Sequence, residues 1–290
     1  MRDERIRAKA KSKSAIGNRK HVLSKGEGSK IPLIVLVNDD GIKSPGLHAL
    51  ALALVSIGEV LIVAPRDQQT STGRSFMGGG VAELVEYHVD GKRVRAFAIA
   101  ASPAMTARYA ILVCAERRPA LVVSGINYGE NVGNGVTISG TVGAALEAAS
   151  MGFPVLAVSR VVHTKYHYTH SDEIDFTVTA HFARKFARRI LERGMPRGAD
   201  VVNVNVPENA REMTPWRWTR VSRTNHYRSV ITQTPRGKSL DTYELCLDSE
   251  TPEPDSDVRA VMIDHVVSVS PLTFDLTARV TEKEKARWER

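Results

Sequence analysis

The sequence predicts an α/β fold, a three-layer sandwich in which helices cover both faces of a mostly parallel sheet. Two observations carry this prediction. Segments that are apolar throughout, such as IPLIVLV (31–37), alternate along the chain with segments of helical periodicity, such as SPGLHALALALVSIG (44–58). Continuously apolar strands are typical of strands buried on both faces. The intervening helices supply the long connections that parallel strands need.

The individual elements follow from their own patterns. After the strand at 31–37, Ser44 is the expected N-cap of a helix over 44–58, with Pro45 at its first position. A strand at 59–65 precedes a hairpin over 80–102 that turns at Asp90-Gly91. The elements expected next are a helix at 102–116, strands at 120–125 and 154–159, helices at 139–152 and 171–194 (N-cap Ser171), and a strand at 199–207.

The domain organisation follows from charge and proline content. The formal charge is +8, and residues 1–30 hold ten Lys or Arg against three acidic residues, so +7 lies in this segment and +1 in the other 260 residues. We expect 1–30 to be a disordered basic tail, in which a weak electrostatic contact with nucleic acid is the alternative to a solvated arm. We expect residues 31–290 to form one domain, with a core over about 31–210 and an irregular C-terminal extension of strands and helix over about 211–290 that serves oligomerisation.

Composition excludes several classes of protein. No apolar run approaches the ~20 residues that span a bilayer, and the polar first residues lack the apolar segment of a secretory signal. Cys114 and Cys246 are far apart in sequence and form no CxxC pair, which fits a reducing compartment. We therefore expect a cytoplasmic protein with no membrane partner and no specific nucleic-acid partner, in which Cys114 is a core residue.

Two adjacent carboxylates follow the first strand, in VLVNDDGIKSPG (35–46). In open parallel sheets, ligands bind beyond the carboxyl ends of the strands, where Asp39 and Asp40 fall. Neighbouring carboxylates repel each other and raise each other's pKa unless a cation offsets the charge. The pair therefore favours a divalent-cation site over the alternative, in which Asp40 caps the helix and Asp39 is solvated.

Other strand ends add oxygen ligands and an anion site. VAPRDQQTSTGRS (63–75) leaves the second strand with several hydroxyl groups, and VVSGINYGENVGNG (122–135) leaves a later strand with Asn127. An oxygen-only set suits Mg²⁺, Mn²⁺ or Ca²⁺ rather than zinc. In SGTVGAALEAA, the start of a helix brings free N–H groups and hydroxyls that favour phosphate, although an ordinary serine N-cap is the alternative. The expected metal ligands are Asp39, Asp40, Thr70 and Asn127, and the expected phosphate-binding residues are Asn38, Asn127, Ser139, Gly140 and Thr141.

Over about 31–277 the chain resembles the SurE family of metal-dependent nucleotidases, also called survival protein E. The matching motifs are VNDDGIKSPG, VAP with its hydroxyl-rich loop, VVSGINYGENVG, SGTVGAALEA, GFPVLAVS, VNVNVP, PRG and SVSPLTFDLT. The resemblance implies a Rossmann-like three-layer sandwich that hydrolyses nucleoside 5′- and 3′-monophosphates. It also implies one divalent cation per subunit, Mg²⁺ or Mn²⁺ (Ca²⁺ in a crystal), and a homodimer or tetramer assembled through C-terminal segments.

The chain departs from the family pattern at three places. Thr70 stands where the family usually has serine, with Ser71 next to it as an alternative hydroxyl ligand. Arg66 stands where an aspartate is common, and Asp67 follows it. In ASPAMT (101–106), Met105 and Thr106 replace an acidic residue and a cysteine in a stretch that the resemblance places near the site. We expect these last changes to affect substrate preference and to leave the metal set intact.

The mechanism expected from these residues is direct hydrolysis. A cation at Asp39 and Asp40 would activate water, with Asp39 favoured as the residue that orients or deprotonates it. The alternatives are a phosphatase with an aspartyl nucleophile, which adjacent aspartates fit poorly, and a non-catalytic sensor of nucleotide and metal. A dinucleotide-binding oxidoreductase is disfavoured because no GxGxxG follows the first strand.

The histidine-rich stretch HTKYHYTH (163–170) has helical spacing that suggests a zinc face. Because it follows a strand and contains Thr and Tyr, we expect a loop instead. Tyr166 or Tyr168 is then a candidate for stacking on a nucleobase.

Overall fold

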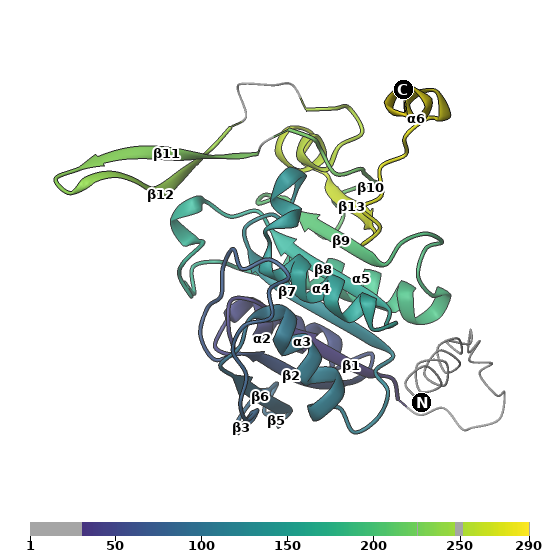
Figure 1. Cartoon of the computed structure of the whole chain (residues 1–290). Helices are drawn as coiled ribbons and strands as arrows, with labels where there is room; N and C mark the ends of the chain where they lie inside the picture. The colour runs from purple at the N-terminus through teal and green to yellow at the C-terminus, as the bar shows by residue number, and fades with distance from the viewer. Residues whose placement is uncertain (1–30, 225, 247–251, 290) are drawn as a thin grey trace, which may run out of the picture. The chain divides into compact units, whose positions relative to one another are not determined.

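The computed structural model describes residues 31–224, 226–246 and 252–289 (Figure 1). Within these ranges nine strands form one sheet in the order β10-β13-β9-β8-β7-β1-β2-β6-β3. The strands are β1 (Leu33–Val37), β2 (Glu59–Pro65), β3 (Glu83–Val85), β6 (Arg95–Ile99), β7 (Leu121–Tyr128), β8 (Val155–Arg160), β9 (Val201–Val206), β10 (Trp216–Trp218) and β13 (Val267–Leu272). In the order of the sheet, the six neighbouring strands β9, β8, β7, β1, β2 and β6 are all parallel to one another. The predicted tail over 1–30 lies outside the described residues.

Helices cover both faces of the sheet, which confirms the predicted α/β fold. On one face α2 (Pro45–Leu54) and α5 (Thr177–Arg193) pack against Ile34 and Leu36. On the other, α3 (Pro103–Tyr109), its π-helical continuation η1 (Ala110–Cys114) and α4 (Gly140–Ser150) pack against Leu33, Val35 and Val37. Alternate residues of β1 therefore serve opposite layers, and this explains why the strand is apolar throughout. Cys114 is buried, as predicted.

The hairpin predicted to turn at Asp90-Gly91 is confirmed. β4 (His88–Val89) pairs antiparallel with β5 (Lys92–Arg93), and Asp90 and Gly91 have φ of 49° and 69°. Positive φ at both central residues is what a type I′ turn requires.

Two helix boundaries differ from the prediction. α2 ends at Leu54, where the chain turns into β2, rather than at 58. The helix predicted over 171–194 begins at Thr177, so Ser171 is not its N-cap. Tyr128 Oη donates a hydrogen bond to the Ser171 carbonyl and Arg160 Nη1 donates one to the Asp175 carbonyl. These two carbonyls therefore accept hydrogen bonds from side chains distant in sequence, and residues 171–176 do not form the backbone hydrogen bonds of a helix.

The C-terminal region contributes both to the sheet and to a separate hairpin. β13 lies between β9 and β10, antiparallel to β9. β11 (Tyr227–Thr234) and β12 (Gly237–Leu245) form a two-stranded hairpin that extends away from the sheet (Figure 1). α6 (Glu282–Trp288) is a short polar helix near the end of the chain. None of the described helices is both long and apolar enough to cross a bilayer.

Candidate active site

A tight turn follows β1 and presents the two aspartates. Asn38 closes it with both ends of its amide: Nδ2 donates to the Gly41 carbonyl (3.0 Å) and Oδ1 accepts from the Gly41 N–H (3.2 Å). Gly41 has φ of +94°, which favours glycine. Asn38 is fully buried with its amide engaged in this way, so it holds the turn and lies outside the cavity described below.

Asp39 is held against the N-terminus of α4. Thr141 Oγ1 donates a short hydrogen bond to Asp39 Oδ1, and Thr141 is itself fully buried. Gly140 approaches so closely that a Cβ atom there would lie 2.7 Å from Asp39 Oδ2. Thr141, expected to bind phosphate, thus positions Asp39 instead. Ser139 accepts from the Val142 N–H as the N-cap of α4 and also faces the cavity.

Asp40 lies behind Asp39 and is 1% exposed. Its carboxylate accepts hydrogen bonds from Gln68 Nε2 (3.2 Å) and, more weakly, from the Tyr128 N–H (3.4 Å). Gln68 Nε2 also donates to the His167 carbonyl (2.7 Å), so it joins Asp40 to the histidine-rich loop.

Burial without a counter-charge perturbs both carboxyl groups. Desolvation raises the pKa of Asp39 to about 6, although the hydrogen bond from Thr141 opposes the shift. The pKa of Asp40 is raised well above its ordinary value by burial and then by repulsion from Asp39. No Lys, Arg or His of the described residues forms an ion pair with either aspartate. The pair fits a bound divalent cation, which would remove this repulsion.

A cavity of about 320 Å³ opens at Asp39. The predicted residues that line it are Asp39, Thr70, Asn127, Ser139 and Gly140, together with Ser71. Asn127 Nδ2 donates to the Gly129 carbonyl (2.7 Å), an arrangement that leaves its Oδ1 as an acceptor for a ligand. Thr70 and Ser71 both reach the cavity, so either hydroxyl suits the ligand position. The predicted convergence of strand-end residues is thus present around Asp39.

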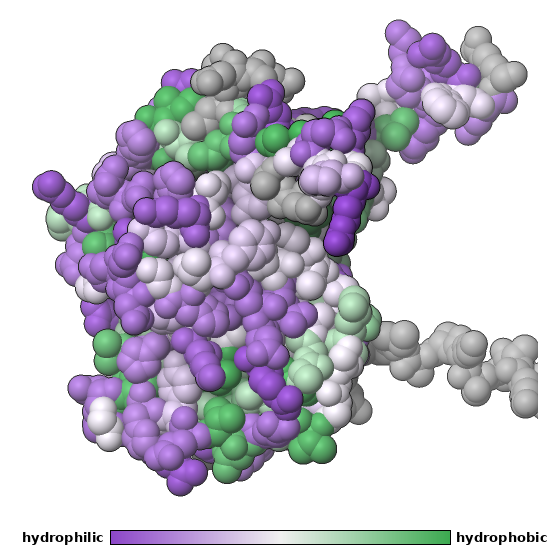
Figure 2. Space-filling model, turned by 90° about the vertical axis from the view of Figure 1, so that its left-hand side faces the viewer, coloured by the Kyte–Doolittle hydropathy of each residue, from purple (hydrophilic) through white to green (hydrophobic). Residues whose placement is uncertain are grey.

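The opposite wall of the cavity joins the predicted Tyr168 to residues of the β11–β12 hairpin that no sequence motif indicated. Tyr227 and Arg228 come from β11 and Tyr243 from β12, and they meet Tyr168 and His167 from the histidine-rich loop. Tyr243 contacts His167 (ring centroids 6.0 Å apart), Tyr168 (6.5 Å) and Tyr227 (5.3 Å). Figure 2 views the side toward which the β11–β12 hairpin extends, and hydrophilic residues dominate the middle of this face. The cavity thus has a polar end at Asp39 and an aromatic end at the hairpin.

A buried acid–base pair fixes the hairpin at its base. His226 Nε2 and Tyr227 Oη both bond to Glu130 Oε1, at 2.6 Å and 2.5 Å. Burial raises the pKa of Glu130, but the hydrogen bond and charge of His226 and the Tyr227 hydroxyl outweigh it, so the net pKa lies below its usual range.

The histidine-rich stretch is a loop containing the short 3-10 turn Thr164–Tyr166, as predicted. Its histidines make separate contacts: His163 Nδ1 accepts from the Lys165 N–H, His167 Nδ1 bonds Tyr243 Oη, and His170 Nε2 bonds the Asp40 carbonyl. Of the two tyrosines predicted to stack on a base, Tyr168 lines the cavity. Tyr166 packs against the core, and its hydroxyl donates to Glu173.

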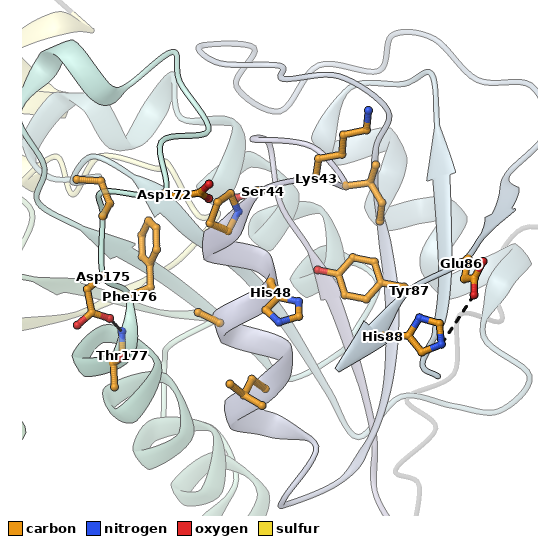
Figure 3. A pocket seen from close by; sticks show the side chains of 15 residues that line it. Lys43, Ser44, His48, Glu86, Tyr87, His88, Asp172, Asp175, Phe176 and Thr177 are labelled. Atoms are coloured by element: carbon orange, nitrogen blue, oxygen red, sulfur yellow. Dashed lines mark hydrogen bonds and ion pairs between the residues drawn. The ribbon is translucent and has the colours of Figure 1, made fainter. Parts of the chain in front are cut away.

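Other depressions lie away from the aspartates. One, of about 660 Å³, is lined by side chains including His48 and Tyr87, which face each other in Figure 3, while His88 pairs with Glu86 at its rim. It holds none of the predicted site residues, so the candidate active site is the smaller cavity at Asp39. Met105, expected near the site, lines a separate depression beside Phe76, and Thr106 is buried in α3. Neither residue lines the cavity at Asp39, and their effect on substrate preference stays a prediction.

Comparisons with known proteins identify the family. The family model for survival protein SurE matches residues 34–228. The chain is 40% identical to the 5′-nucleotidase SurE of Methanothrix thermoacetophila, over 85% of this chain and 94% of the relative. It is 39% identical to the 5′-nucleotidase SurE of Thermococcus gammatolerans, over 85% and 92% of the two chains. The crystal structure of the SurE protein from Aquifex aeolicus superposes with a TM-score of 0.69 at 30% identity, over 89% of this chain and all of that one. The chain belongs to the SurE family.

Proposed function

We propose that the protein is a phosphomonoesterase of the 5′-nucleotidase class that requires a divalent cation. Its substrates are nucleoside 5′-monophosphates and, with them, 3′-monophosphates. The observation that carries the proposal is a buried carboxylate pair that has no basic partner among the described residues and that borders, through Asp39, a cavity at the N-terminus of α4. The relatives named as 5′-nucleotidases support the reaction class.

The residues fit a hard cation. Asp39 and Asp40 supply negative charge, Asn127 a free amide oxygen, and Thr70 a hydroxyl, with Ser71 as its neighbour. These four residues, Asp39, Asp40, Thr70 and Asn127, would hold one Mg²⁺ or Mn²⁺ ion per subunit. When bound there, such a cation polarises the phosphoryl group and makes hydroxide available near neutral pH.

The protein's own groups orient the phosphoryl group and deprotonate the attacking water. The Gly140 N–H and the Ser139 hydroxyl hold the phosphoryl oxygens at the positive end of α4, while the Ser139 N–H is engaged by the Gly135 carbonyl. Asp39 orients the attacking water and takes its proton as the oxygen–phosphorus bond forms. The ester oxygen leaves with the nucleoside and acquires a proton from solvent. The nucleoside extends toward Tyr168 and Tyr243, where aromatic faces suit a base.

Phosphate release from AMP, GMP and their 3′ isomers, with Mg²⁺ or Mn²⁺, tests the proposal. We expect Asp40→Asn to lower turnover by about a hundredfold or more. Asp67→Asn, at an exposed carboxylate in the neighbouring loop, is the matched control and should keep wild-type turnover. Binding of AMP and Mn²⁺ without release of phosphate would instead identify a sensor. A trapped phosphoenzyme would identify an aspartyl nucleophile.

We also propose that the protein forms homodimers or tetramers through the β11–β12 hairpin. Ile231 and Leu240 are 66% and 64% exposed on this projecting element. Exposed aliphatic side chains on a projecting hairpin favour contact with a second subunit. Light scattering should give a smaller mass for Ile231→Asp/Leu240→Asp than for the wild type. An unchanged mass would rule out this hairpin as the interface.

A further inference from the structure

The outer face of α5 carries a cluster of cations without acidic partners. Arg184, Lys185 and Arg188 lie on the side of α5 away from its buried residues, and Arg189 and Arg193 border that buried side towards the end of the helix. Lys185 and Arg189 also lie over the rings of Phe182 and Phe186. None of these five makes an ion pair with any carboxylate of the described residues, whereas Arg74 and Arg108 both pair with Glu147. Cations are favoured at the C-terminal end of a helix, which explains the cation in the last turn of α5 but not Arg184 or Lys185.

These cations adjoin a groove with aromatic walls. The groove, of about 400 Å³, is lined in part by Arg189, Arg193, Trp216 and Trp218. The same two arginines belong to a second depression of about 370 Å³ along α5, in which the cations outnumber the one carboxylate of its lining, Glu192. Trp218 is 52% exposed, and the Arg189 guanidinium lies 4.9 Å from the ring centroid of Trp216. Charged and aromatic groups therefore form one continuous surface, which we call the α5–β10 groove.

We propose that the α5–β10 groove binds single-stranded nucleic acid without sequence preference. A single strand presents phosphates along its backbone and unstacked bases beside them. Cationic side chains match the phosphates, and an exposed indole ring matches a base face. Inorganic polyphosphate would match the cations alone, and an acidic peptide offers no regular series of planar rings. The charge of +1 over residues 31–290 hides this site because acidic residues elsewhere balance it.

The groove is separate from the candidate active site. Its lining shares no residue with the cavity at Asp39. Binding there is therefore an additional property of the protein, and variants of the groove are expected to keep nucleotidase turnover. That turnover also reports that each variant is folded.

Fluorescence anisotropy on the full-length chain, with a labelled oligouridine of about 12 nucleotides, tests the proposal. We expect Arg184→Glu/Arg188→Glu to weaken binding about tenfold or more and to flatten the salt dependence, because two phosphate contacts become repulsive. We expect Trp218→Ala to weaken binding about fivefold through lost stacking. Lys92→Glu/Arg93→Glu reverses two exposed cations on β5 and should stay within about twofold of the wild type, as the matched control.

Competition with inorganic polyphosphate separates charge from stacking. Under the proposal, Trp218→Ala loses affinity for oligouridine and keeps its affinity for polyphosphate. Wild-type oligouridine binding by the Arg184/Arg188 variant would assign the binding to the basic N-terminal residues and overturn the proposal. A second outcome would also overturn the proposal: Trp218→Ala changes the oligomeric mass in light scattering but leaves oligouridine binding intact. The groove would then be a surface for self-association.

Discussion

Replacing Gly140 by alanine perturbs the carboxylate pair without removing a functional group. The new Cβ would lie 2.7 Å from Asp39 Oδ2 and 2.8 Å from Asp39 Cβ, whereas ordinary contacts begin at 3.4 Å, so the two groups must separate by about 0.7 Å. Asp39 cannot yield freely, because Thr141 holds its Oδ1 and the Gln69 N–H holds its carbonyl. Misplacement of a reacting group by ~1 Å can cost ~10²-fold in rate. We therefore expect kcat/KM to fall roughly tenfold to a hundredfold, or about 1.4–2.8 kcal/mol of transition-state stabilisation.

The assay is phosphate release from AMP together with Mn²⁺ affinity by titration calorimetry. Global stability should change by less than about 1 kcal/mol, since alanine favours a helix over glycine and offsets part of the strain. Gly135→Ala is the matched control, because Gly135 also lines the cavity but a Cβ there meets nothing within 4 Å. Wild-type Mn²⁺ affinity and turnover in Gly140→Ala would refute the argument that close approach of α4 positions Asp39.

Three further outcomes are expected. The pKa of Asp39 is raised to about 6, so between pH 4 and 6 the folded state holds a proton that the unfolded state releases, and the stability of the metal-free protein falls as the pH rises through this range. The increase in Tm caused by Mn²⁺ should then be larger at pH 7.5 than at pH 5. An increase that does not depend on pH would contradict this. Glu130→Gln should lower the free energy of unfolding in urea by about 1–3 kcal/mol at pH 7. The loss should shrink below pH 4.5, because a carboxyl of lowered pKa stops contributing stability as it becomes protonated. Equal losses at pH 7 and pH 4 would argue against the pair with His226. Phe182→Ala should destabilise the chain by about 3–5 kcal/mol in the same assay while the exposed Arg188→Ala stays within about 0.5 kcal/mol, and similar losses would mean that α5 is not packed as described.

The sheet was predictable because its signal is local. Strands such as β1 serve both layers, so every residue is apolar and the strand is evident from a few letters. The start of α5 was not predictable in this way. The side chains of Ser171 and Asp175 accept from N–H groups two residues on, which are local bonds. Their carbonyls accept from Tyr128 and Arg160, which are distant in sequence and which no local pattern specifies.

The same distinction holds for the candidate site. The residues at strand ends were found because the carboxyl ends of parallel strands meet at one edge of a sheet. Gln68 and the tyrosines of the hairpin were missed, since no local pattern states that the base of the β11–β12 hairpin borders the cavity at residue 39. The roles of Asn38 and Thr141 depended on hydrogen-bond partners, which a motif does not specify.

The position of β13 has a consequence for synthesis of the chain. β13, at 267–272, is inserted between β9 at 201–206 and β10 at 216–218. A nascent polypeptide therefore exposes the unpaired amide groups of β9 until residues 267–272 have been translated. Such an open edge is a template for intermolecular pairing. Premature termination shortly before residue 267 should thus yield an aggregating product rather than a smaller soluble enzyme.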